Sequence, residues 1–244
     1  MTYMGRSGVN VQENVKIKMC GLTLPADIET VNELLPDYIG FVFAAASRRF
    51  ITFEAAAALK ARLDPGIRTV GVFVDEAPET VAELLRQGTI DLAQLHGHED
   101  EAYLRKLRAL TKKPLIRAFR VTSPEDIHLA NASSADFVLL DSGAGSGRTF
   151  AWELLRDIRR PYFLAGGLAP ENVGEAIKTC RPFAVDVSSG IETEGRKDPD
   201  KMKAFSAEVR KHGRIIPLPN NIDTQDEEET LQKANCEVSY KSLD

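Results

Sequence analysis

Eight short apolar runs recur along the chain, and their regular spacing limits what it can fold into more than any other feature. The runs are rich in the β-branched and aromatic residues typical of strands, and they cover residues 17–21, 38–43, 68–74, 92–97, 115–121, 137–142, 162–167 and 183–190. Successive runs begin 21 to 30 residues apart. A strand, a crossover helix and two short loops fill about that length. The spacing therefore predicts eight repeated strand–helix units.

The segments between the runs carry helix signals. Residues 25–35 place Ile28, Val31 and Leu34 at helical spacing, and residues 52–63 are rich in alanine. Ser123 followed by Pro124 is typical of a helix N-cap and first turn. Helices are also expected over residues 77–87, 100–110, 170–179 and 200–211, and in the stretch after Phe150 as far as Ile158.

Eight alternating units predict a parallel sheet with right-handed crossovers, closed into a single (β/α)8 barrel (a TIM barrel) over residues 15–212. The alternative is an open doubly wound sheet. Such a sheet would carry a GxGxxG turn after its first strand and an acidic residue about 20 positions later, and the sequence has neither.

The two ends of the chain differ from this repeating middle. Residues 1–14 are polar and are expected to form a flexible leader. Residues 213–244 are expected to form a disordered tail, since residues 223–229 hold five acids and no base and can bury little surface. The alternative for this tail is an arm that binds a partner.

Composition excludes several classes of protein. Lysine and arginine number 31 against 36 acidic residues, a net charge of −5, which argues against a nucleic-acid or polybasic membrane binder. No apolar run approaches the roughly 18 residues that span a bilayer, and no signal peptide is evident. The sparse, odd set Cys20, Cys180 and Cys236 is typical of free thiols in a reducing compartment. We expect a cytoplasmic protein, monomer or homodimer, without nucleic-acid or membrane partners.

Two strand ends carry groups suited to proton transfer. Side chains at the C-terminal ends of barrel strands point into the active site. Cys20 and Asp141 lie near the ends of the first and sixth runs. A thiolate base facing a carboxylic acid would suit proton transfer from carbon and to oxygen. The alternatives are a small buried apolar role for Cys20 and a turn or N-cap role for Asp141.

The ends of the seventh and eighth runs are suited to phosphate. Gly166 and Gly167 expose backbone N–H groups, and Ser188, Ser189 and Gly190 add hydroxyl donors and an open turn. Barrels of this class often bind phosphate between these two loops. The glycine-rich loop at residues 143–147 offers a third segment of this kind. The alternative is that these glycines only make tight turns.

Charged residues elsewhere are less specific. Arg48 and Arg49 follow the second run, where either could hold a carboxylate or phosphate bidentately or simply lie in solvent. His96 and His98 form an HxH pair, but no helix supplies the carboxylates that would complete a metal site. No metal is predicted.

Taken in order, the strand-end motifs resemble those of the phosphoribosylanthranilate isomerase family. The matching motifs are KIKMCGLT at 16–23, GFVF at 40–43, GVFV at 71–74, QLHG at 94–97, LLDS at 139–142, LAGGL at 164–168 with PENV at 170–173, and VDVSSGIE at 185–192. The resemblance covers residues 15–211.

The resemblance implies an aldose–ketose isomerase of tryptophan biosynthesis that needs no metal or cofactor. Its reaction is the Amadori rearrangement of N-(5-phosphoribosyl)anthranilate to 1-(2-carboxyphenylamino)-1-deoxyribulose 5-phosphate. By motif, Cys20 corresponds to the base at C2 of the ribose, Asp141 to the acid at the ring oxygen, and Arg49 to the arginine at the anthranilate end. The phosphate site corresponds to Gly166, Gly167, Ser188, Ser189 and Gly190. The acid requires a raised carboxyl pKa, which partial burial would supply, and the base requires a thiol pKa near neutral.

The sequence departs from the family pattern at three places. Met19 is the first. Arg48 stands where the family usually has a proline, and residues 150–152 lack the usual aspartate. Arg48 leaves open which arginine reaches the substrate. The alternative functions are another barrel enzyme acting on a phosphorylated sugar, or a non-catalytic partner in the same pathway.

Overall fold

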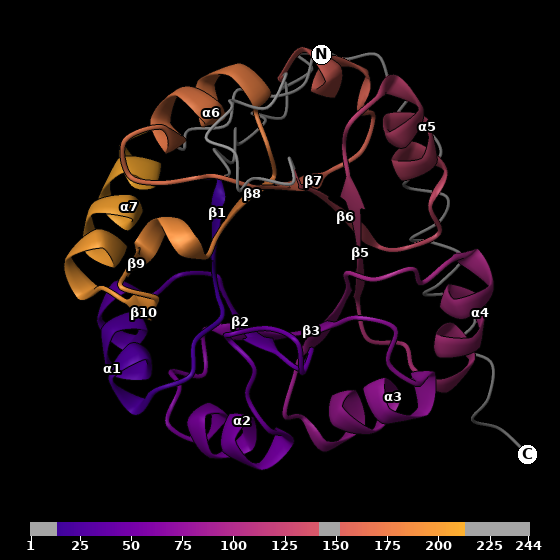
Figure 1. Cartoon of the computed structure of the whole chain (residues 1–244), viewed down its shortest axis with the longest axis horizontal. Coiled ribbons are helices and arrows are strands. Elements are labelled where there is room, and N and C mark those ends of the chain that lie inside the picture. Colours follow the sequence, from indigo (N-terminus) through magenta and orange to yellow (C-terminus); the bar gives the residue numbers. More distant parts are fainter. Residues whose placement is uncertain (1–13, 142–151, 213–244) are drawn as a thin grey trace, which may run out of the picture.

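Eight parallel strands close into a barrel in the computed structural model, which describes residues 14–141 and 152–212 (Figure 1). The strands are β1 (Lys16–Cys20), β2 (Tyr38–Val42), β3 (Arg68–Phe73), β4 (Leu92–Leu95), β5 (Leu115–Arg120), β6 (Phe137–Asp141), β7 (Tyr162–Ala165) and β8 (Ala184–Val187). Each strand pairs with the next along the chain, and β8 closes the ring by pairing with β1. The predicted (β/α)8 barrel is confirmed.

Helices form the outer ring in Figure 1. They are α1 (Pro25–Leu34), α2 (Phe53–Lys60), α3 (Pro78–Gln87), α4 (Glu101–Leu110), α5 (Pro124–Ala132), α6 (Val173–Cys180) and α7 (Pro199–His212). Within the described residues, none of the helices is both long enough and apolar enough to cross a membrane.

One crossover differs from the prediction. The segment before β7 contains the 3-10 helix η1 (Trp152–Asp157) in place of the expected α-helix as far as Ile158. Pro161 disfavours helical backbone at Arg160, so the helical segment ends before that residue. The adjoining residues 142–151 lie outside the described part of the chain.

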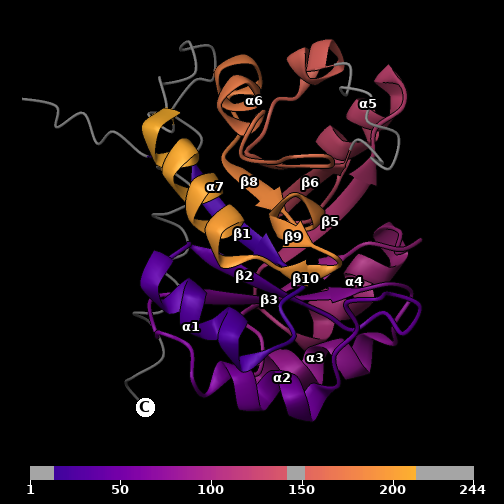
Figure 2. The ribbon, with the colours of Figure 1, turned by 60° about the vertical axis from the view of Figure 1, so that its left-hand side comes forward.

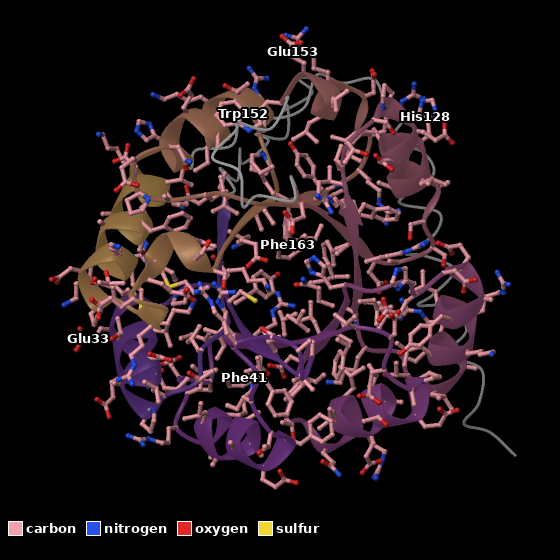
Figure 3. The ribbon with its side chains drawn as sticks, viewed as in Figure 1. Glu33, Phe41, His128, Trp152, Glu153 and Phe163 are labelled. Carbon is pink, nitrogen blue, oxygen red and sulfur yellow. The ribbon has the colours of Figure 1, made fainter. Side chains whose placement is uncertain are left out.

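The barrel interior is apolar at its N-terminal end and polar toward its C-terminal end. Alternate residues of each strand point inward. The apolar layer consists of Tyr38, Val70, Leu92, Ile116, Leu139, Phe163 and Ala184, with Phe163 inside the ring in Figure 3. Toward the other end, the buried Lys18 and Gln94 and then Cys20 take inward positions. Polar groups therefore gather at the end where barrels of this class place their active sites.

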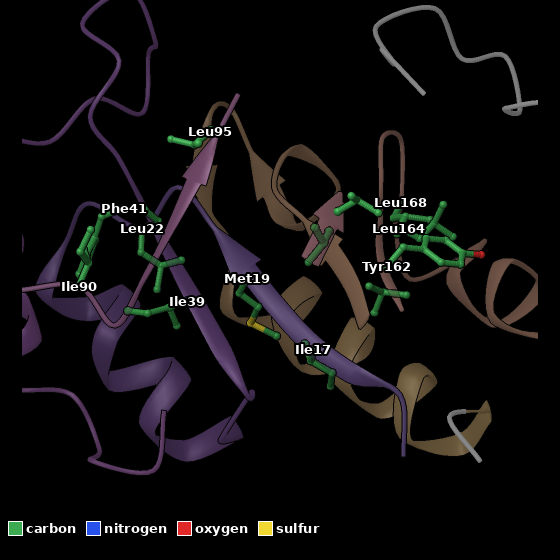
Figure 4. Close-up of a cluster of buried hydrophobic side chains, with 14 of the residues drawn as sticks. Ile17, Met19, Leu22, Ile39, Phe41, Ile90, Leu95, Tyr162, Leu164 and Leu168 are labelled. Carbon is green, nitrogen blue, oxygen red and sulfur yellow. The ribbon is translucent and has the colours of Figure 1, made fainter. Parts of the chain in front are cut away.

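A larger apolar core lies between the strands and the helices. Ile17 and Met19 of β1 and Ile39 and Phe41 of β2 are fully buried there, as Figure 4 shows. Charged residues such as Glu33 lie at the outer rim in Figure 3. This packing holds the strands in a fixed ring, so the loops at their ends have defined positions.

A short hairpin after β8 was not expected from the sequence. The predicted eighth run extends to Gly190, but β8 ends at Val187 and the 3-10 helix η2 (Ser189–Ile191) follows. The strands β9 (Glu192–Thr193) and β10 (Arg196–Lys197) then pair antiparallel. Glu194 and Gly195 form the tight turn that joins the two strands, and their positive φ angles of 52° and 79° suit such a turn. Figure 2 shows the hairpin beside the barrel at β1 and α7.

Candidate active site

A cavity of about 230 Å³ opens at the C-terminal ends of the strands. Its lining includes most of the residues that the sequence singled out: Cys20, Arg49, Asp141, Gly166, Gly167, Ser188 and Ser189. The barrel brings them together from the ends of β1, β6, β7 and β8 and from the loop after β2. His96, Gln94 and Asp186 line the same cavity.

Cys20 is the last residue of β1 and is almost fully buried, with 7% of its surface exposed. A Cβ atom at Gly40 of β2 would come within 2.5 Å of its sulfur, so the glycine makes room for the thiol. The carbonyl oxygen of Cys20 accepts a hydrogen bond of 3.0 Å from the Ser188 hydroxyl. The strand end and the loop after β8 are thus tied together.

Burial raises the pKa of the Cys20 thiol above its ordinary value, because a buried site disfavours the thiolate. The ammonium groups of Lys18 and Lys197 act in the opposite direction, and the Asp186 carboxylate acts with burial. The predicted base requires a thiol pKa near neutral, whereas in this structure burial outweighs the two lysines and raises the pKa of Cys20.

Asp141 ends β6 at the edge of the cavity, with 26% of its side chain exposed. Its carboxylate lies 3.5 Å from Nε2 of His96. The Gln94 amide nitrogen lies 2.8 Å from Nδ1 of the same ring. With Gln94 donating to Nδ1, the proton of a neutral His96 lies on Nε2 and faces Asp141.

The structure separates the two arginines of the loop after β2. Nε and Nη2 of Arg49 donate to the two carboxylate oxygens of Glu192, at 2.6 and 2.9 Å, and Arg49 lines the cavity. Arg48 reaches Glu192 from outside, with 59% of its side chain exposed. Gly21 leaves space for Arg49, since a Cβ there would lie 2.3 Å from its Cδ.

Glu192 also accepts a 2.7 Å hydrogen bond from Lys197 of β10, whose side chain is nearly buried. Burial alone would raise the pKa of Glu192, but the bonds from Arg49 and Lys197 outweigh it and hold the pKa below its ordinary value. Lys197 further donates to the backbone oxygen of Ser188, at 2.9 Å. The carboxylate therefore joins the arginine loop to the loop after β8.

The loops after β7 and β8 have the backbone that the sequence suggested. Gly166 and Gly167 have φ angles of 93° and 64°, a conformation that L side chains rarely adopt. Gly190 lies behind the cavity wall, where a Cβ would come within 1.9 Å of the Leu168 carbonyl oxygen. This close approach holds the two loops against each other.

Three charged residues beside the site were not predicted from the sequence: Lys18, Glu192 and Lys197. The signal available for Lys18 was its position two residues before Cys20, which places both side chains on the same face of a strand. No comparable signal marked Glu192 and Lys197, because their partners lie on other elements.

The loop at residues 143–147 and the tail from residue 213 fall outside the described residues.

A second cavity, of about 270 Å³, lies at the opposite end of the barrel beside Tyr162, Cys180 and Phe183. Its lining is mostly apolar, and burial raises the pKa of Cys180 to about 12. Across residues 14–141 and 152–212, no three histidine, cysteine or acidic side chains are placed to hold a metal ion.

Comparison with known proteins gives a consistent result. A family model described as N-(5'-phosphoribosyl)anthranilate (PRA) isomerase matches residues 17–208. The isomerase of Endomicrobium trichonymphae is 45% identical over 192 residues, covering 77% of this chain and 94% of the relative. That of Thermoanaerobacter sp. (strain X514) is 43% identical over 203 residues, covering 80% and 98%.

Solved structures agree with the sequence matches. The crystal structure of phosphoribosyl anthranilate isomerase from Thermotoga maritima matches with a TM-score of 0.73 and 38% identity, over 81% of this chain and 99% of that one. Another isomerase structure, in complex with reduced 1-(o-carboxyphenylamino)-1-deoxyribulose 5-phosphate, matches with a TM-score of 0.71 and 37% identity, over 81% and 99%. These matches do not favour the alternative functions. The chain belongs to the N-(5'-phosphoribosyl)anthranilate isomerase family, and its function is the aldose–ketose isomerisation of tryptophan biosynthesis that the motifs predicted.

Proposed function

We propose that Cys20 is the general base and Asp141 the general acid of this isomerisation. In the same proposal, Arg49 binds the carboxylate of the anthranilate end. The substrate phosphate is held by Gly166, Gly167, Ser188 and Ser189, with Gly190 holding their loops in place. The ligand of the related isomerase structure is a reduced carboxyphenylamino deoxyribulose phosphate, which has both an aromatic carboxylate and a phosphate end.

These roles follow from what must happen to convert the aldose into the ketose. The ring C1–O bond breaks with its electron pair on oxygen, which takes a proton from Asp141, while the anilino nitrogen forms a double bond to C1. Cys20 then removes the proton from C2, and these electrons form the C1–C2 double bond of an enolamine. Return of a proton to C1 and loss of one from the C2 hydroxyl give the ketone. The first step therefore requires a group that donates a proton to oxygen, and the second requires a group that accepts a proton from carbon.

One observation carries the proposal: Cys20 and Asp141 line the same cavity as Arg49 and the two glycine- and serine-rich loops after β7 and β8. A substrate with a carboxylate at one end and a phosphate at the other would span this cavity with its ribose between thiol and carboxyl. The bidentate Glu192 contact supports the role of Arg49 over Arg48, because it fixes the guanidinium at the cavity wall.

The test is a turnover assay with phosphoribosylanthranilate formed in situ from anthranilate and phosphoribosyl pyrophosphate, followed by loss of its fluorescence. Cys20→Ala and Asp141→Asn are each expected to lower kcat by at least about 100-fold, the usual contribution of a general acid or base. Cys180→Ala, at the opposite end of the barrel, serves as the matched control and should keep full activity. Near-full activity in a folded Cys20 or Asp141 variant would refute that residue's role.

The proposal also includes a cytoplasmic location, a catalytic unit confined to residues 15–212, and no nucleic-acid partner. The two cysteines within the described residues, Cys20 and Cys180, are free thiols, which agrees with a reducing compartment.

A further inference from the structure

An ion pair lies inside the barrel beneath the cavity. Lys18 of β1 stands directly opposite Asp186 of β8 in the strand register. Its ammonium nitrogen lies 3.0 Å from each carboxylate oxygen, and the two side chains are 0% and 9% exposed. Removing two charges from water is costly, and apolar residues often replace such pairs without loss of stability. Stability alone therefore does not account for an ion pair at this position.

The position of the pair relates it to Cys20. Lys18 and Cys20 are two residues apart on β1, so both side chains point into the barrel, with the lysine one layer deeper. The Lys18 ammonium acts electrostatically on Cys20 as well as on Asp186, to which it is hydrogen-bonded. Asp186 lines the cavity together with Cys20. A cation and an anion thus act on the thiol from below.

We propose that Lys18 and Asp186 are positioning residues that control how readily Cys20 releases its proton. Lys18 stabilises the thiolate, and Asp186 holds the ammonium in place and limits that stabilisation. This inference rests on the proposed role of Cys20 as the general base.

Other charged groups face the same thiol. Lys197 of β10 and Arg49 of the loop after β2 act on it electrostatically, but both bind Glu192, at 2.7 and 2.6 Å. His96, in the loop after β4, and Asp141, at the end of β6, also line the cavity. Lys18 differs from these groups because it lies in the barrel interior and its carboxylate partner also borders the thiol.

The protonation of Lys18 agrees with this role. Burial pushes the pKa of Lys18 down, but Asp186 and Cys20 outweigh it and raise the pKa above its ordinary value. Lys18 therefore remains an ammonium group at neutral pH. Burial lowers the pKa of Lys197, and its hydrogen bond to Glu192 offsets part of that effect.

The experiment measures the thiol directly rather than through turnover. The full-length chain is alkylated with iodoacetamide between pH 6 and about 10, and the rate at Cys20 is read by peptide mass. The variants are Lys18→Gln, Asp186→Asn and the double variant. Cys180, at the far end of the barrel, is the internal control in every sample. Thermal unfolding establishes that each variant is folded.

The two single substitutions should shift the rate in opposite directions. Lys18→Gln is expected to slow Cys20 alkylation at pH 7 about tenfold, because the thiolate loses the cation one layer below it. Asp186→Asn is expected to speed it about tenfold, because the thiolate then gains the ammonium group for itself. The double variant should lie between them, and the Cys180 rate should not change.

A purely structural role predicts a different pattern. Unchanged Cys20 rates in both folded single variants, or rates that move in the same direction, would overturn the inference. If Lys18→Gln does not fold, Asp186→Asn and the double variant still differ only at residue 18, and equal rates in those two would overturn it as well.

A separate comparison tests the role of the base. The pH profile of kcat/KM should follow the alkylation profile in each variant. Alkylation shifts without matching kinetic shifts would support control of the thiol by Lys18 and Asp186, and would refute Cys20 as the base.

Discussion

Glu192 is the residue on which the cations beside the cavity converge. It accepts hydrogen bonds from Arg48, Arg49 and Lys197 while only 4% of its side chain is exposed. Arg49 has no freedom to turn away while both of its bonds to this carboxylate hold. The residue therefore orients a proposed substrate contact without touching substrate.

We expect Glu192→Gln to raise KM more than it lowers kcat. The substitution removes the charge that holds Arg49, and hydrogen bonds to charged groups contribute about 1.5–3 kcal/mol each. Steady-state kinetics should therefore show kcat/KM lower by about tenfold or more. Arg48→Ala is the matched control, because this exposed arginine binds the same carboxylate from outside and its loss should have little effect on KM. A KM equal to that of the wild type in Glu192→Gln would contradict the orienting role.

At the scale of elements, Asp91 ties helix α2 to the sheet just before β4. One of its carboxylate oxygens accepts bonds from Lys60 at the end of α2 and from the backbone nitrogen and hydroxyl of Thr69 on β3, at 2.6, 2.8 and 2.9 Å. Burial alone would raise the pKa of Asp91, but these bonds outweigh it and lower the pKa below 3.8. The ionised carboxylate is thus the form that stabilises the fold.

Asp91→Asn is expected to lower the free energy of unfolding by about 1–3 kcal/mol at neutral pH. Because the folded pKa lies below the unfolded value, this contribution is complete above pH 3.8 and is lost as the pH falls through the folded pKa. Denaturant titrations at several pH values should show that the difference in free energy of unfolding between wild type and variant decreases in acid. Glu33→Gln, on the exposed face of α1, should show no such difference. A difference that stays constant below pH 3.8 would refute the assignment.

Also at this scale, the sequence predicted strands and long helices well and short elements poorly. Every predicted strand is present, because strands that are buried on both faces appear in the sequence as short continuous apolar runs. The hairpin β9–β10 has two residues in each strand, too few for any periodicity. Its position depends instead on contacts with Arg48 and Arg49 from another part of the chain.

For the molecule as a whole, the catalytic unit is expected to be residues 15–212. The family model spans residues 17–208, and the Thermoanaerobacter relative aligns over 98% of its own length with 203 residues. A chain truncated after His212 should keep the kcat, KM and thermal midpoint of the full-length protein, because every proposed site residue and the described core remain. Loss of turnover in the truncated chain would show that the tail belongs to the catalytic unit. Loss of a co-purifying protein with turnover intact would favour the partner-binding arm.

The barrel, the order of its strands and the strand ends that carry reactive groups are all predictable from the sequence alone. These features depend on local periodicity and on the rule that consecutive strand–helix units pair side by side. Cys20, Asp141 and the glycine pair at 166–167 were found in this way, since each stands at a strand end. Which side chains contact one another at these strand ends depends on the folded ring. Lys18 and Asp186 are 168 residues apart and touch because β8 closes onto β1 in one particular register. That register, and the burial that raises the pKa of Cys20, come from packing of the whole ring, which no local segment encodes.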